Sequence, residues 1–477
     1  MKRASGVLMH ISSLYGDYGI GSFGNEAISF IDFLSESGFT YWQVLPFCLP
    51  DECNSPYKSF GAFSGNPYFV DLNSLFNEGL LTESELDSAK QSSPYLCEFD
   101  SLKQNRLSLL KKACERFSNF DKMNAFYKEN PQVLKFCEFM AIKKSNGNLS
   151  HKDWKIFTCD EDELNLYKFI EYKFFTQWLK IKNYANSKGV KIIGDIPIYV
   201  DYDSADLYYN KQEFLLDKNG NPSLVAGVPP DYFAKDGQLW GNPLYDYNQM
   251  KKSGYSWWKD RISFYAKYFD GVRIDHFRAF QDFYAIKNGS TTAKNGVWKK
   301  GPRLDIIKAI KEVSGNLEII AEDLGVITSE VRKLVDKSGF PGMRVLQFGF
   351  SGEKNSPHLP HNYSPNTVVY TGTHDNNTLL GFMWESDDLT KKTITDYFGI
   401  DNHNWNNSYD EIIRQMLLSS ANTVIFPIQD LLKYGSDTRM NTPGSSKNNW
   451  AFRITKEGLD RIDKKYLKRI NELYDRI

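Results

Sequence analysis

The chain has 477 residues, a mass of 55.0 kDa and a formal net charge of −1, with charged residues of both signs making up 25 % of it. Length alone allows a large buried core, and the balanced charge argues against nucleic acid as the main partner, because phosphate binding needs a basic surface or stripe. No stretch approaches the ~18–20 apolar residues that a membrane span needs, so we expect no membrane partner.

The amino end and the cysteines predict a cytoplasmic protein. Lys2 and Arg3 resemble the charged start of a signal peptide, but no uninterrupted apolar segment follows them. The cysteines share no C-x-x-C spacing, and the seven histidines do not cluster near them, so neither a disulfide framework nor a zinc site is predicted. We expect six free thiols, at Cys48, Cys53, Cys97, Cys114, Cys137 and Cys159.

Eight short runs rich in Val, Ile, Tyr or Phe recur along the chain, and helical stretches lie between them. Most of these runs end in Gly, Pro, Asp or His, as strands that lead into loops do. In chain order they are GVLMHISSL near residue 6, YWQVLPF from Tyr41, KIIGDIPIYV from Lys191, FDGVRIDHF from Phe269, LEIIAEDLG from Leu317, MRVLQFGF from Met343, TVVYTGTHD from Thr367 and NTVIFPIQD from Asn422. Repeated strand–helix alternation favours an α/β protein built as a (β/α)₈ TIM barrel over an open doubly wound sheet.

A bare barrel needs about 250 residues, so a large part of the chain must form insertions between barrel strands. The stretch of about 50–185 contains amphipathic segments such as SLKQNRLSLLKKACERF, which predict a mainly helical insertion. The stretch of about 200–260 is rich in Tyr, Trp, Pro and Gly, which predicts a loop-rich insertion at the mouth of the barrel. No linker marks a second domain, so we expect residues 1–477 to form a single catalytic unit.

The first candidate acid is Asp275, at the end of the run FDGVRIDHF. Residues two apart in a strand point the same way, so Arg273 and Asp275 share one face, toward the barrel axis. A guanidinium beside a carboxylate favours its ionised, nucleophilic form. The alternative is a structural Arg–Asp pair inside the barrel.

The second candidate acid is Glu322, where an apolar strand runs directly into a Glu-Asp pair. Glu322 continues the face of Ile320, and Asp323 points away. A barrel would expose this strand end to the cleft, and a general acid there needs a partly apolar setting to keep its proton near neutral pH. An ordinary polar strand end remains the alternative.

The third candidate acid is Asp375, preceded by His374 in YTGTHDNNT. Gly and Thr let the chain turn and then place an imidazole and a carboxylate side by side. The pair could ligate a metal, but no third and fourth ligands follow at suitable spacing. Two neighbouring sugar hydroxyls suit the His-Asp pair better, because a hydroxyl can donate a hydrogen bond to the carboxylate and accept one from the imidazole.

Taken together, the acids and the longer motifs resemble one family. Retaining glycosidases use two carboxylates about 5–5.5 Å apart, a spacing that two adjacent barrel strands can supply. The chain resembles the amylomaltases, the 4-α-glucanotransferases of glycoside hydrolase family 77 in the α-amylase clan. The matching segments are SPYKSFGAFSGNPYFVDL from Ser55, GDIPIYV from Gly194, VAGVPPDYFAKDGQLWGNPLYDY from Val225, FDGVRIDHFRAF, IAEDLG, GTHDN and MNTPGSSKNNWAFR from Met440.

The resemblance implies a role for each matching residue. Asp275 matches the family's nucleophile, Glu322 its acid/base, and Asp375 the carboxylate that holds the 2- and 3-hydroxyls of a distorted sugar. Arg273 contacts the nucleophile, Tyr57 stacks on the same sugar, and Trp240 lies in the loop on the acceptor side. The full set of implied substrate-binding residues is Ser55, Tyr57, Asp195, Asp231, Trp240, Arg273, His374 and Asn441.

The implied activity is transfer of α-1,4-glucan segments, with maltooligosaccharides as donors, glucose or a glucan as acceptor, and no metal or organic cofactor. A two-step displacement through a covalent glucosyl-enzyme retains the α configuration. The nearest alternative is an α-1,4-glucan hydrolase with the same acids, because only the acceptor side of the site separates the two. A catalytically idle glucan-binding protein is disfavoured by the intact acids, and a metal-dependent barrel hydrolase by the lack of a ligand cluster.

Overall fold

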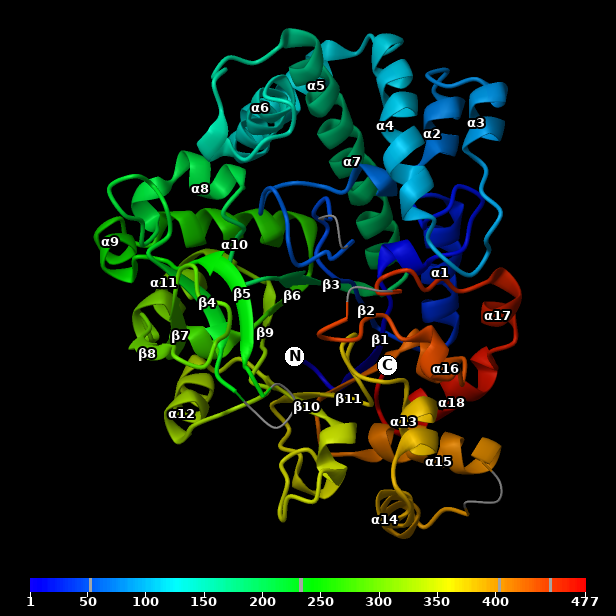
Figure 1. The fold of residues 1–477 in the computed structure, drawn as a ribbon. Helices are drawn as coiled ribbons and strands as arrows, with labels where there is room; N and C mark the ends of the chain where they lie inside the picture. The colour runs from blue at the N-terminus through cyan, green and yellow to red at the C-terminus, as the bar shows by residue number, and fades with distance from the viewer. Residues whose placement is uncertain (51–53, 231–234, 402–404, 446–447) are drawn as a thin grey trace.

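The computed structural model describes residues 1–50, 54–230, 235–401, 405–445 and 448–477. Eight parallel strands close into a barrel in the order β1-β12-β11-β10-β9-β6-β3-β2 (Figure 1). They are β1 (Ala4–Leu8), β2 (Tyr41–Gln43), β3 (Lys191–Ile196), β6 (Gly271–Ile274), β9 (Glu318–Ala321), β10 (Gly342–Val345), β11 (Thr367–Tyr370) and β12 (Thr423–Pro427). Each comes from one of the eight predicted runs, and the predicted (β/α)₈ barrel is confirmed.

Helices that bury one apolar face lie around the barrel. In α12, for example, Thr328 caps the first turn by accepting a hydrogen bond from the N–H of Val331, and the helix stops where Gly339 adopts a left-handed φ of 70°. These helices are α1 (Asn25–Glu36), α10 (Ser256–Tyr268), α11 (Leu304–Ser314), α12 (Ser329–Ser338), α13 (Leu379–Glu385), α14 (Asp388–Phe398), α15 (Trp405–Leu418), α16 (Ile428–Leu431), α17 (Lys456–Asp460) and α18 (Lys464–Leu473).

The chain between β2 and β3 forms a group of helices beside the barrel, which Figure 1 shows from blue to green-cyan at the top. The longest, α7, has 27 residues and begins where the carboxylate of Asp160 accepts a hydrogen bond from the N–H of Glu163. It then leads directly into β3. The six helices are α2 (Leu72–Asn77), α3 (Glu83–Ala89), α4 (Phe99–Glu115), α5 (Phe120–Glu129), α6 (Pro131–Ser145) and α7 (Glu161–Ser187).

A four-stranded antiparallel sheet in the order β5-β4-β7-β8 accompanies the barrel, and the sequence did not predict it. Its strands are β4 (Leu224–Val228), β5 (Gln238–Pro243), β7 (Asp282–Lys287) and β8 (Val297–Lys300), and the short helices α8 (Ala205–Tyr209) and α9 (Tyr247–Lys252) flank the first two. β4 pairs with β7, although α10 and β6 lie between these two strands in the sequence. A pairing between segments this far apart in the chain is not visible in any local sequence pattern.

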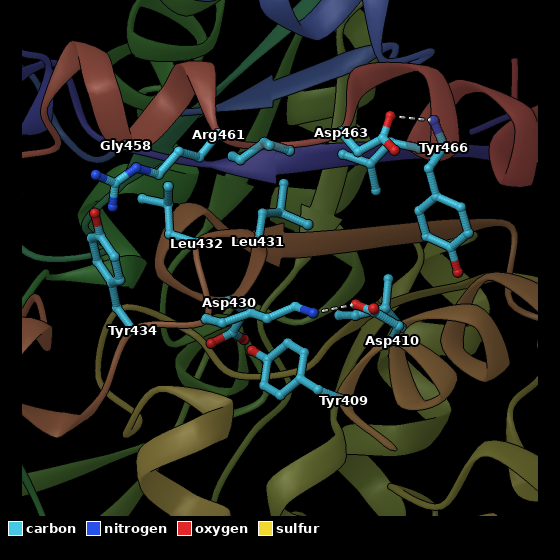
Figure 2. A pocket seen from close by; sticks show the side chains of 14 residues that line it. Tyr409, Asp410, Asp430, Leu431, Leu432, Tyr434, Gly458, Arg461, Asp463 and Tyr466 are labelled. Carbon is cyan, nitrogen blue, oxygen red and sulfur yellow. Dashed lines mark hydrogen bonds and ion pairs between the residues drawn. The ribbon is translucent and has the colours of Figure 1, made fainter. Parts of the chain in front are cut away.

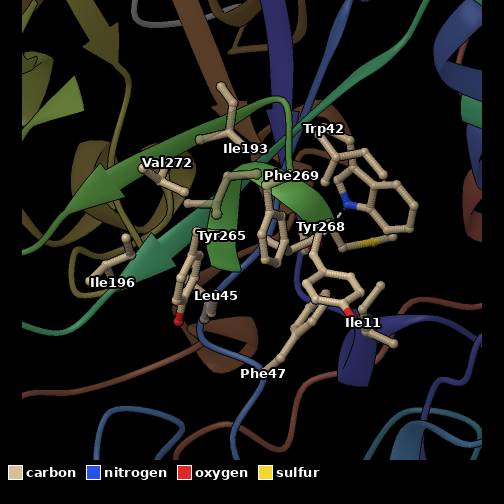
Figure 3. Packing of buried hydrophobic residues seen from close by; sticks show 14 of the residues in the cluster. Ile11, Trp42, Leu45, Phe47, Ile193, Ile196, Tyr265, Tyr268, Phe269 and Val272 are labelled. Atoms are coloured by element: carbon tan, nitrogen blue, oxygen red, sulfur yellow. Dashed lines mark hydrogen bonds between the residues drawn. The ribbon is translucent and has the colours of Figure 1, made fainter. Parts of the chain in front are cut away.

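The core joins the barrel to the helices through large aromatic side chains (Figure 3). Trp42 is fully buried, and its indole N–H donates to the carbonyl of Met9 at 2.8 Å. Phe269 packs against β3 at Gly194, where a Cβ atom would lie 2.9 Å from the Phe269 ring. Gly194 therefore allows the close approach that fixes the strand just before Asp195.

The two ends of the chain meet at the barrel. The buried guanidinium of Arg476 donates to the carbonyl of Ala4 at 3.0 Å, and Arg3 donates to the carbonyl of Tyr474 at 2.8 Å. These bonds tie the segment after α18 to the start of β1.

The described cysteines are free, as predicted for them, and burial raises the pKa of the Cys97 thiol to about 12. Cys53 lies outside the described residues. Among the residues that the structure describes, no helix is long and apolar enough to cross a bilayer.

Candidate active site

Two of the three predicted acids follow neighbouring barrel strands at their carboxyl ends. Ile274 of β6 and Ala321 of β9 are paired in register, so Asp275 and Glu322 are the next residues on the two strands. The N–H of Glu322 donates to the carbonyl of Ile274 at 3.1 Å, which continues the pairing to this point. Because neighbouring strands lie about 4.8 Å apart, the register suits the carboxyl separation of a retaining enzyme.

Arg273 lies between two carboxylates at the floor of the site. Its Nη2 contacts Asp275 Oδ1 at 2.7 Å, and its Nη1 contacts the two oxygens of Asp195 at 2.7 and 3.0 Å. The expected common face of Arg273 and Asp275 is therefore present. Burial raises the pKa of Asp195 to about 6, although the Arg273 charge acts against this rise. The guanidinium thus links Asp275 to Asp195, which belongs to the neighbouring strand β3.

Glu322 is buried and held by backbone donors. The N–H of His276 donates to its Oε2 and the N–H of Leu324 to its Oε1, both at 2.7 Å. Burial raises the pKa of Glu322 to about 7; Arg273 opposes the rise and the negative charge of Asp275 adds to it. A carboxyl group with this pKa carries a proton for part of the time at neutral pH, as a general acid must.

The neighbouring Asp323 faces away from Glu322, as the strand alternation predicted. Its Oδ1 accepts a hydrogen bond from the N–H of Met343 at 2.7 Å, and its Oδ2 lies 3.0 Å from Arg344 Nη1. The Glu-Asp pair therefore divides into one group that faces the site and one that ties β9 to β10.

Asp375 lies in the loop after β11, where two side chains hold its carboxylate. His374 Nε2 is 3.3 Å from Oδ2, and Asn441 Nδ2 donates to Oδ1 at 2.6 Å. Partial burial acts to raise the pKa of Asp375, but His374 and Asn441 outweigh it and lower this pKa to about 2. The side chain is 46 % exposed, so an ionised acceptor remains open to a ligand.

An aromatic wall joins Asp375 to Asp195. The Tyr57 ring stacks on His374 with centroids 5.0 Å apart, and its hydroxyl donates to Asp195 Oδ2 at 2.7 Å. Ser55 supports this wall, because its Oγ accepts a hydrogen bond from the N–H of Tyr57 at 3.3 Å.

Trp450 belongs to the same wall, and the sequence did not predict it as a site residue. Its ring centroid lies 5.9 Å from Tyr57 and 5.8 Å from His374. The signal was present in MNTPGSSKNNWAFR, but nothing in that segment reveals the left-handed φ of 64° that turns Trp450 inward.

Next to Asp275, the Trp240 ring of β5 meets the His276 ring edge to face, with the ring centroids 4.8 Å apart. His276 was also not predicted, although it directly follows Asp275 in the motif RIDHF. Burial lowers the pKa of His276 to about 4, so its imidazole is neutral at pH 7. The predicted substrate-binding residue Asp231 lies outside the described residues.

The site thus brings Asp275, Glu322, Arg273 and Asp195 together. The Asp375 group joins it through Tyr57 and Asp195, and Trp240 joins it through His276, the residue after Asp275. A carboxylate paired with Arg273 stands next to a carboxyl group that can hold a proton near pH 7. Such a pair can perform a double displacement at a sugar anomeric centre without further groups.

Comparison with known proteins agrees with this chemistry. A family model described as 4-alpha-glucanotransferase matches residues 9–459. The chain is 42 % identical to a 4-alpha-glucanotransferase of Streptococcus pneumoniae, with 100 % of this chain and 98 % of that protein covered. It is 38 % identical to the 4-alpha-glucanotransferase of Aquifex aeolicus, with 99 % of each covered.

The similarity extends to a solved structure. An amylomaltase from Streptococcus agalactiae in complex with acarbose superposes with a TM-score of 0.95 at 38 % identity, and 100 % of both chains is covered. Amylomaltase from Corynebacterium glutamicum, at 17 % identity and a TM-score of 0.82, shares the fold. The chain belongs to the 4-alpha-glucanotransferase family, glycoside hydrolase family 77.

Proposed function

We propose that the protein is a 4-α-glucanotransferase that moves α-1,4-glucan segments from a donor to the 4-hydroxyl of an acceptor glucan or glucose. The observation that carries this proposal is the adjacent pair of Asp275, bound to Arg273, and Glu322, whose pKa is raised to about 7. A nucleophile needs a positioned carboxylate and a general acid needs a proton. Asp275 is positioned by its contact with Arg273, and Glu322 can hold a proton near pH 7.

In the first step, an oxygen of Asp275 attacks the anomeric carbon of the donor and the glycosidic bond breaks. Glu322 gives its proton to the leaving oxygen, so the new reducing end departs as a neutral sugar. In the second step, the now ionised Glu322 removes the proton of an incoming 4-hydroxyl, which displaces Asp275. Two inversions leave an α linkage, and Glu322 returns to its protonated state.

Around the reacting centre, we assign Asp375 and His374 to the 2- and 3-hydroxyls of the sugar bound to Asp275. The ionised, half-exposed carboxylate accepts hydrogen bonds, and the stacked Tyr57–His374 rings offer an apolar face to the sugar. Ser55, Asp195 and Asn441 hold these groups in position. The relative from Streptococcus agalactiae forms a complex with acarbose, which supports a sugar-like ligand for this protein.

Transfer exceeds hydrolysis only if an acceptor sugar is held and water is kept away from the intermediate. Trp240, 36 % exposed and placed on His276, is our candidate for the acceptor platform, and the insertion of about 200–260 for the lid that carries it. We regard residues 1–477, including the helical insertion of about 50–185, as one catalytic unit that works in the cytoplasm.

Incubation with maltotriose tests the activity directly. We expect glucose and longer maltooligosaccharides to form while the number of reducing ends stays constant, because each cleavage is followed by a new bond. A steady rise in reducing ends without longer products would identify a hydrolase instead. The Asp275→Asn variant serves as the control for background activity in the preparation.

A further inference from the structure

Asp430, the third residue of α16, is fully buried and lies outside the set of residues that contact the sugar. Its Oδ1 accepts a hydrogen bond from the N–H of Leu379 at 2.8 Å, and its Oδ2 accepts one from the hydroxyl of Thr371. One carboxylate therefore binds two points of the chain that are eight positions apart. Such bonds to a charged acceptor are about twice as strong as neutral ones.

The two points are the ends of the loop that carries His374 and Asp375. Thr371 directly follows β11, and Leu379 is the first residue of α13, so its N–H has no acceptor within that helix. Inside the loop, the Asn376 side chain accepts a hydrogen bond from the N–H of Thr373 at 2.9 Å. The carboxylate thus closes the loop at its base while this local bond shapes its tip.

The residue before Asp430 holds the second loop that reaches Asp375. Gln429 Nε2 donates to the carbonyl of Thr438 at 3.0 Å. The chain then continues to Arg439, whose Nη2 donates to the carbonyl of Asp375 at 3.2 Å, and to Asn441, which donates to its carboxylate. Both loops that position Asp375 are therefore fastened to two consecutive residues at the start of α16.

On its other side, Asp430 lies at the wall of a cavity. Figure 2 shows its carboxylate beside the Tyr409 hydroxyl. Both residues line a cavity of about 360 Å³, together with Leu431 and Tyr434. Burial raises the pKa of Asp430 to about 6, and the hydrogen bonds from Thr371 and Leu379 oppose this rise. Burying a carboxylate is costly, so its bonds to the loop are what compensate the cost.

We propose that Asp430 is a positioning residue for the reaction: by holding both ends of the 371–379 loop, it sets Asp375 and His374 against the sugar. This inference rests on the proposed function, in which Asp375 holds the sugar during bond breaking. A misplacement of about 1 Å can cost about 10²-fold in rate, so loosening the loop should lower kcat.

Two substitutions of Asp430 differ in whether the hydrogen bonds to the loop can still form. Asp430→Ala removes both acceptors, and we expect kcat for maltotriose disproportionation to fall about 10- to 100-fold with KM changed less than about 3-fold. Asp430→Asn keeps an acceptor for the Leu379 N–H, and its amide can donate to the Thr371 oxygen. We expect this variant to retain kcat within about 5-fold of the wild type, because the loop stays closed.

A carboxylate at the opposite end of the barrel supplies the matched control. Asp270 precedes β6, accepts a hydrogen bond from the N–H of Ile192 at 2.8 Å and pairs with Lys182 at 3.0 Å. Asp270→Ala removes a comparable backbone acceptor far from the acids. We expect it to lower the thermal unfolding temperature while leaving kcat unchanged at temperatures where the variant is folded.

The decisive measurement is a double-mutant cycle with Asp375→Asn, each variant first checked for folding by circular dichroism. If Asp430 acts through Asp375, adding Asp430→Ala to Asp375→Asn changes kcat less than about 3-fold. Additive losses, or an Asp430→Ala variant with wild-type kcat, would overturn the positioning role. Should Asp430→Ala fail to fold, Thr371→Val, which releases one end of the loop, replaces it in the cycle with the same expectation.

The same cycle keeps this inference apart from the proposed function. Full activity of Asp375→Asn alone would remove Asp375 from the reaction and refute the function assigned to it. Loss of activity in Asp375→Asn together with an unaffected Asp430→Ala would refute only the inference about Asp430.

Discussion

Replacing Arg273 by Met tests the central ion pairs most severely. Its side chain is 5 % exposed and contacts Asp195 and Asp275, so the variant leaves a fully buried carboxylate without its cation. Removing one partner of such a buried pair costs about 3–5 kcal/mol. An unfolding entropy of about 2.1 cal/mol/K per residue gives roughly 1 kcal/mol/K for 477 residues, so the unfolding temperature should fall by about 3–5 °C.

The same variant should shift two proton equilibria in a known direction. Arg273 lowers the pKa values of Asp195 and Glu322, which burial raises to about 6 and about 7. Without the guanidinium both values rise further. In the variant both carboxyl groups keep their protons to a higher pH than in the wild type. The stability deficit relative to the wild type should therefore grow as the pH rises above about 6, where the wild-type groups begin to ionise.

The kcat should fall about 10²- to 10³-fold, because a preorganised donor beside Asp275 is lost. The alkaline limb of the pH–rate profile should move to higher pH, because the pKa of Glu322 rises. The assays are thermal unfolding at several pH values and initial rates of glucose release from maltotriose. Arg344→Met is the matched control, since Arg344 pairs with Asp323 on the face away from the site. We expect that control to keep kcat within a few-fold. An Arg273→Met enzyme with near wild-type kcat, or an alkaline limb at lower pH, would refute the reasoning.

Three further predictions concern the acids and the acceptor side. The wild-type transfer rate should decline above about pH 7 as Glu322 loses its proton, and initial rates measured from pH 5 to pH 9 will contradict this if they stay flat. Asp275→Asn should fold normally and lose transfer by several orders of magnitude, which circular dichroism and product analysis check together; full activity would exclude it as nucleophile. Trp240→Ala should raise the ratio of reducing ends to transfer products from maltotriose several-fold, because water then competes with a weakly held acceptor; an unchanged ratio would remove Trp240 from the acceptor side.

The barrel and its acids could be predicted because the signals are local. Each strand is a short β-type run that ends in polar residues, and alternation along FDGVRIDHF places Arg273 and Asp275 on one face. The 2.7 Å contact between them follows from that alternation. That Asp275 and Glu322 lie side by side could be predicted by assuming only that their strands are neighbours in the barrel.

The features that could not be predicted depend on contacts between distant segments. The β5-β4-β7-β8 sheet joins strands from both sides of β6, and no periodicity within one strand shows this. Trp450 reaches the Tyr57 wall only through a left-handed backbone turn. Asp430 was part of the predicted run NTVIFPIQD, but its role depends on the ends of a loop about 50–60 positions earlier in the chain.

The raised pKa of Glu322 lies between these two cases. Its position at the end of an apolar strand was visible in LEIIAEDLG, and a general acid there needs a partly apolar setting. The size of the rise depends on the charge of Asp275 and the opposing charge of Arg273, which belong to the neighbouring strand. Site chemistry of this kind follows from the assembled barrel rather than from any single motif.

The most direct test of the central claim is to trap the glycosyl-enzyme. In Glu322→Gln, an activated donor such as α-maltotriosyl fluoride needs no acid to react, and the missing base should slow the second step. Mass spectrometry of the digested protein should then find one maltotriosyl group on the peptide that contains Asp275. A sugar attached to any other residue, or no adduct while the fluoride is consumed at the wild-type rate, would contradict the account.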